Sequence, residues 1–159
     1  MHKDQGERRS GAFSCLMAAM LLTALFLGLY ALTGVTEFSP RLSTQVLLFA
    51  GLSLAAGLVL LQPVRSIKKD AWNARLIELA LYGVYALALL SWLFYLVSQI
   101  NYITNMLVAI DGTKLSLIFV ISVLLIGAAW VLSLMTAVRF GKSLRISAGA
   151  DAEQEAQHA

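Results

Sequence analysis

The stretch LSLIFVISVLLIGAAWVLSLMTAV, residues 115–138, decides the fold of this chain because it contains no charged side chain. It is longer than the roughly 20 apolar residues that a helix needs to cross a hydrocarbon core of about 30 Å. Three further apolar stretches lie before it, at residues 12–34, 44–64 and 71–100. A segment in lipid must satisfy its own backbone hydrogen bonds, so each stretch is expected to form a helix. The sequence therefore predicts an all-α, polytopic membrane protein with four transmembrane helices in an up-down bundle.

The composition excludes several other classes of protein. Of the 159 residues, 59% are apolar and 13% are charged, and this charged share is about half of that in soluble globular domains. So few polar side chains cannot cover the surface of a soluble enzyme, which excludes that class. A chain with so many apolar residues is also not intrinsically disordered. The single cysteine, Cys15, excludes an intramolecular disulfide.

The expected organisation is one membrane domain between two short tails. Residues 1–11 form a polar N-terminal tail, residues 12–138 hold the four spans, and residues 139–159 form a C-terminal tail. The apolar part of the first span is longer than the core of a cleaved signal peptide, so we expect a retained helix.

The distribution of basic residues predicts the orientation. Ten of the twelve Lys and Arg residues fall in the N-terminal tail, in the segment from the end of span two to Arg75 at the start of span three, or in the C-terminal tail. Only Arg41 and Lys114 fall in the other two loops. Positively charged loops stay in the cytoplasm. We therefore expect both termini in the cytoplasm, in the inner membrane of a bacterium.

The spans lack the residues that known chemistry needs. Both histidines, His2 and His158, lie in the tails, and no group of Cys, His or acidic residues has the spacing of metal ligands. No nucleophile with a base and no phosphate-binding glycine loop is present. We expect neither enzymatic activity, nor a metal, nor a cofactor.

Glu78 is the acidic residue that enters an apolar stretch, with Arg75 one helical turn before it. A carboxylate in hydrocarbon costs roughly 2.5–3.5 kcal/mol at the centre of a span, so such a residue is a candidate for proton or ion transfer. The spacing i, i+3 also permits a structural ion pair between the two side chains. Both interpretations, and a contact of Glu78 with a partner subunit, stay open.

Small residues four positions apart occur in three of the predicted spans. Such pairs let helix backbones approach closely in lipid, within one bundle or between proteins. The candidates are Ala24 with Gly28, Gly51 with Ala55, Ser53 with Gly57, and Ala129 with Ser133.

Basic residues at the predicted cytoplasmic face are candidates for contact with anionic lipid headgroups. Each basic side chain near such a surface contributes about 1 kcal/mol to its attraction. This explains the basic balance of the chain without nucleic acid as a partner. The residues are Arg65, Lys68, Lys69, Arg139, Lys142 and Arg145.

Two motifs resemble an uncharacterised family of bacterial four-helix membrane proteins. The first is the loop RSIKKD at 65–70, followed by Asn73-Ala74-Arg75-Leu76, and the second is the exit RFGKSLR at 139–145. The loop is shorter than in that family and lacks the Pro-Phe that usually precedes the asparagine. The resemblance implies the four-helix fold and no established activity.

Three functions are compatible with these features. The first is a non-enzymatic accessory or structural subunit that contacts another membrane protein, or a second copy of itself, through its helices. The second is a small oligomeric transporter or channel that uses Glu78. The third is a membrane immunity or regulatory protein.

Overall fold

The computed structural model describes residues 2–33, 42–65, 71–108 and 116–157, and this part of the chain is helical without strands. Four of the helices are long and apolar enough to cross a membrane, so the predicted fold class is confirmed. The helices are α1 (His2–Thr33), α2 (Thr44–Arg65), α3 (Ala71–Ser98), α4 (Ile100–Leu107) and α5 (Leu117–Gln157).

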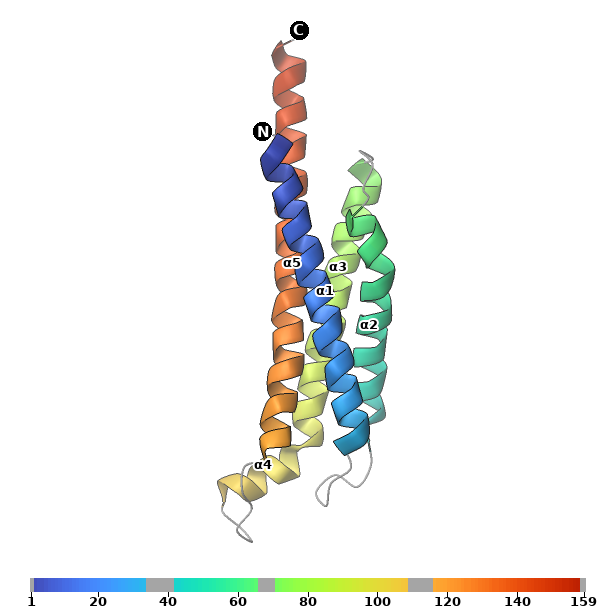
Figure 1. Ribbon diagram of the computed structural model, residues 1–159, viewed down its shortest axis with the longest axis vertical. Helices are drawn as coiled ribbons and strands as arrows, with labels where there is room; N and C mark the ends of the chain where they lie inside the picture. The colour runs from blue at the N-terminus through green and yellow to red at the C-terminus, as the bar shows by residue number, and fades with distance from the viewer. Residues whose placement is uncertain (1, 34–41, 66–70, 109–115, 158–159) are drawn as a thin grey trace.

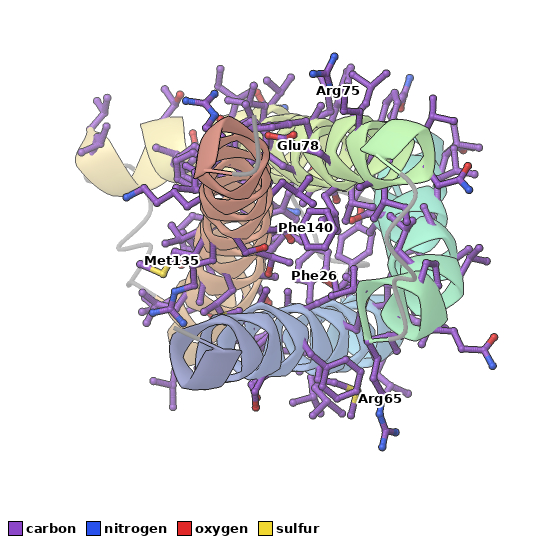
Figure 2. All side chains as sticks on the ribbon, turned by 90° about the horizontal axis from the view of Figure 1, so that it is seen from above. Phe26, Arg65, Arg75, Glu78, Met135 and Phe140 are labelled. Carbon is purple, nitrogen blue, oxygen red and sulfur yellow. The ribbon has the colours of Figure 1, made fainter. Side chains whose placement is uncertain are left out.

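The long helices alternate in direction and pack in a ring (Figure 1). Seen along the bundle, α1 lies between α2 and α5, and α3 closes the ring on the other side (Figure 2). The start of α1 and the end of α5 lie at one end of the bundle, which we call the terminal end. The opposite end, where α1 and α3 finish, is called the loop end.

The outer surface of the bundle is apolar on every long helix. Only 22% to 33% of the residues in the most apolar windows are buried inside the bundle. Large aliphatic side chains on this surface are exposed, among them Leu21, Leu58, Leu79 and Leu124. A soluble monomer does not expose so continuous an apolar surface. The structure is therefore that of a multi-pass membrane protein whose outer side chains face lipid.

Helices α1 and α5 both extend beyond their apolar spans, which are Ser10–Leu32 and Leu117–Arg145. The sequence predicted tails at 1–11 and 139–159, but the helices reach from His2 and to Gln157. The final segment is rich in Ala, Glu and Gln, which favour helix and continue one that has already nucleated. Hydropathy thus locates where a helix leaves the lipid, and not where the helix ends.

The third predicted span, 71–100, holds α3, and the helix breaks at Gln99 before the short α4 continues past the span to Leu107 (Figure 1). At the break the amide of Gln99 donates to the carbonyl groups of both Tyr95 and Leu96, and the Ser98 hydroxyl donates to Tyr95. This shared, tighter bonding ends the regular helix.

Two hydrophobic clusters form the core. The cluster toward the terminal end includes Leu16, Leu81 and Phe140, and the one toward the loop end includes Phe26 and Tyr95. In the second cluster Tyr95 meets the ring of Phe26 edge-on, with centroids 5.4 Å apart, a favourable geometry for aromatic pairs.

Two buried serines join α2 to α3. The Ser53 hydroxyl donates to the Val84 carbonyl group at 3.3 Å, and the Ser91 hydroxyl donates to the Val46 carbonyl group at 3.4 Å. Both bonds fit one antiparallel register. The step from Val46 to Ser53 along α2 is as long as the step back from Ser91 to Val84 along α3. A bond from one helix to the backbone of the other requires close helices, and small residues allow this approach.

Two tyrosines secure the chain at the loop end. The Tyr30 hydroxyl accepts a hydrogen bond from the Ser43 amide at 2.8 Å, and the Tyr102 hydroxyl accepts one from the Ser116 amide. Each serine directly precedes a long helix, where amides lack partners within the helix. The same device therefore fixes the starts of α2 and α5.

We expect Tyr30→Phe and Tyr102→Phe each to lower the free energy of unfolding by about 1 kcal/mol, since each removes one acceptor and keeps the ring. Tyr82→Phe is the matched control, because Tyr82 is exposed on α3. Unfolding of the purified protein in mixed micelles measures the effect. An equal loss in all three variants would contradict the assigned role of the two hydroxyl groups.

We expect Ser53→Ala and Ser91→Ala each to cost about 0.6 kcal/mol, the average for hydrogen bonds between membrane helices. The two bonds lie about 10 Å apart along α2, so their effects should add in the double variant. Ser14→Ala is the control, because its hydroxyl bonds only within α1, to Ser10. A double variant as stable as the wild type would show that these bonds do not hold α2 to α3.

Candidate functional site

Glu78 lies half-buried on α3 and faces α5 near the terminal end (Figure 2). Its carboxylate lies directly against Gly141, where a Cβ atom would collide with an oxygen of Glu78. Gly141 is itself buried. The acidic group therefore occupies space on α5 that any larger residue at position 141 would fill.

Arg75 does not form the ion pair with Glu78 that their spacing permits. Both side chains lie in the described part of the chain, and no ion pair joins them. Arg75 is exposed and points away from the bundle, while Glu78 points toward α5 (Figure 2). A long arginine near the end of a span can extend its charge toward the interface, whereas the shorter glutamate packs against the neighbouring helix.

Gly141 belongs to the RFGKSLR motif, and nothing in that motif indicates its contact with Glu78. The sequence feature that could have indicated the contact is a glycine just after the fourth predicted span, while Glu78 lies in the third. That signal does not specify which of the other three helices the glycine contacts.

The small residues divide into an inward and an outward group. Ser53, Gly57, Ala129 and Ser133 are buried, and a Cβ atom at Gly57 would collide with the Met20 side chain of α1. The outward group consists of Ala24, Gly28 and Ala55, which are exposed, and Gly51, which is half-buried. No atom lies within 4 Å of a Cβ built at Gly28 or Gly51.

The described basic candidates Arg65, Arg139, Lys142 and Arg145 are all exposed at the terminal end. Lys68 and Lys69 lie outside the described residues. Two of the four arginine and lysine side chains contact α1. The Arg139 guanidinium donates from Nη1 to Cys15 Sγ at 3.3 Å, and the Arg65 guanidinium lies 6.0 Å from the centre of the Phe13 ring.

An aromatic stack joins α3 to α5 in the membrane. The Trp92 and Trp130 rings are nearly parallel with centroids 5.7 Å apart, and the Tyr85 ring also stacks on Trp130, with centroids 6.1 Å apart. The buried indole N–H groups of Trp92 and Trp130 have no acceptor in the described residues. Stacking adds about 0.5–1.5 kcal/mol per pair beyond surface burial, so the stack holds the helices that also carry Glu78 and Gly141.

The described residues contain no group of three or more His, Cys, Asp or Glu side chains that could hold a metal ion. The geometry that the chain offers is therefore one half-buried carboxylate between two helices, an outward set of small residues, and two arginines fixed on α1.

Comparisons with protein-family models, with curated proteins and with solved structures found no match for this chain. The resemblance to bacterial four-helix membrane proteins stays a prediction from the sequence. The described part of the chain belongs to the class of multi-pass membrane proteins, with four helices able to span a membrane.

Proposed function

We propose that the chain is a non-enzymatic accessory or structural subunit that binds another membrane protein, or a second copy of itself, through helix–helix contacts. The observation that carries this proposal is the outward group of small residues on α1 and α2. These four positions offer helix surface that the bundle itself leaves uncovered.

The outward group lies at one depth in the membrane. Helices α1 and α2 are antiparallel, and the contacts of Met20 with Gly57 and of Tyr30 with Ser43 fix their register. On α1, Ala24 and Gly28 lie between Met20 and Tyr30. On α2, Gly51 and Ala55 lie between Ser43 and Gly57. Helices associate in lipid by close packing, and not by a hydrophobic force, so exposed small residues at one depth favour a contact there.

The proposed setting is the bacterial inner membrane, with both ends of the chain in the cytoplasm. The support is the excess of Lys and Arg in the segments that meet at the terminal end. Anionic headgroups are the partners that these side chains would contact.

We expect Gly28→Leu and Gly51→Leu to abolish the native complex while the bundle keeps its stability, because both positions are open on the outside. Native mass spectrometry after extraction in a membrane-solubilising polymer measures the complex. Bulk at either position separates the helix from its partner, and the expected loss is at least tenfold in the bound fraction.

Two further glycines supply the controls. Gly83→Leu changes an exposed glycine of α3 that also has open space, and it should leave the complex intact. Gly57→Leu should destabilise the bundle through the collision with Met20. A native complex that survives Gly28→Leu with Gly51→Leu would refute the proposal.

The position of Glu78 favours a second candidate, a small oligomeric transporter or channel. A carboxylate that is half-buried against α5, and that forms no ion pair with the described residues, can bind and release a proton or a cation. The bundle would then work as an oligomer, because core side chains of all four long helices, α1, α2, α3 and α5, fill the centre of the ring.

For this candidate we expect Glu78→Gln to abolish proton- or cation-linked flux in vesicles, since the amide keeps the shape and cannot carry the charge. Arg75→Gln is the matched control, as Arg75 points outward one turn away, and it should retain flux. Thermal unfolding checks that both variants fold. Flux that is unchanged in Glu78→Gln would remove Glu78 from the mechanism.

A further inference from the structure

Two arginines from different helices lie on either side of α1 at the terminal end. Arg65 of α2 lies over the Phe13 ring, and Arg139 of α5 donates to Cys15. The same guanidinium lies 3.3 Å from a Cβ built at Gly11. Since α2 and α5 flank α1 (Figure 2), the two cations border the outward face of α1 from opposite sides.

The helical positions agree with this arrangement. Phe13 and Cys15 lie about 200° apart around the helix axis, because each residue turns an α-helix by about 100°. The buried arc between them holds Ala12 and Leu16, which face the core. The opposite, outward arc holds Ser10 and Ser14, both exposed.

The outward arc has the character of a lipid site. At its upper part the surface between the guanidinium groups is lined by small hydroxyl side chains, Ser10 and Ser14. Toward the middle of the membrane the same face continues as the exposed side chains Met17 and Leu21. Cations and hydroxyl groups above an apolar strip match a phospholipid, with its charged headgroup above its acyl chains.

The separation of the two cations indicates the kind of headgroup. An α-helix with its side chains is about 10–12 Å wide, and a hydrogen bond reaches about 3 Å. One phosphate therefore cannot contact guanidinium groups on both sides of α1. Two phosphates joined by a short polar linker can do so, with the linker over Ser10 and Ser14.

We propose that Arg65 and Arg139 form a site on the outward face of α1 for the two phosphates of a diphosphatidyl lipid of the cardiolipin type. Each guanidinium binds one phosphate and is held in place by its contact with α1. The glycerol linker crosses Ser14, and the acyl chains descend along Met17 and Leu21.

The test is a titration of the purified full chain in detergent with cardiolipin, phosphatidylglycerol and phosphatidylcholine, read by native mass spectrometry. We expect one cardiolipin per chain to bind in preference to the other two lipids. Arg65→Gln and Arg139→Gln should each weaken cardiolipin binding about fivefold, and together about 25-fold.

Two variants separate this site from general surface charge. Arg75→Gln removes one exposed charge from α3 and should leave cardiolipin binding unchanged. Ser14→Leu keeps both cations but fills the path of the linker, and it should weaken binding at least fivefold. Melting curves without lipid check that each variant folds, which is expected because all four side chains are exposed.

Three results would overturn the proposal. The first is an equal loss in Arg75→Gln, which would mean that only total charge matters. The second is phosphatidylglycerol binding as tightly as cardiolipin with the same dependence on both arginines. The third is wild-type binding by Ser14→Leu.

Discussion

The structure depends on close approach of helices that have no hydrophobic reason to associate. In lipid the apolar side chains of a helix are equally well solvated by hydrocarbon and by a neighbouring helix, so packing and polar contacts decide which surfaces meet. In this chain the α2–α3 contact illustrates the consequence. Ser53 and Ser91 reach the backbone of the opposite helix, and they can do so only where both helices present small residues.

The same constraint explains how much of the fold could be predicted. Length and charge alone identified four spans, because a charge in hydrocarbon is costly anywhere along the helix. The face that each helix turns inward was not predictable in this way. In a soluble helix the polar side is the outer side, but here both sides are apolar. The two overlapping pairs of α2, Gly51 with Ala55 and Ser53 with Gly57, were therefore equivalent in the sequence. Only the second pair lies fully inside the bundle.

At the candidate site, too, the type of residue could be predicted from the sequence, but its contacts could not. The cost of a charge in lipid singled out Glu78 from the sequence. The residue that Glu78 contacts did not follow from spacing, because Arg75, three positions before it, has the spacing of a helical ion pair and yet points away. The contact with Gly141 joins residues 63 positions apart in the chain. Such a contact depends on the order of helices in the ring, and hydropathy carries no information about that order.

The polar contacts of the bundle follow depth in the membrane. Serines donate to backbone carbonyl groups among the apolar spans, where water cannot replace a lost bond and a short hydroxyl can be buried with its partner. Tyrosines act at the loop end, where an amphipathic ring can be buried while its hydroxyl reaches the amide just before the next long helix. Arginines act at the terminal end, where a long side chain can lie against α1 while its charged group stays exposed. Helix α1 carries Tyr30, which binds the Ser43 amide, and it also takes part in both arginine contacts. It is therefore fixed at its two ends by polar groups, while its middle, with Ala24 and Gly28 on the outside, is left for apolar contact.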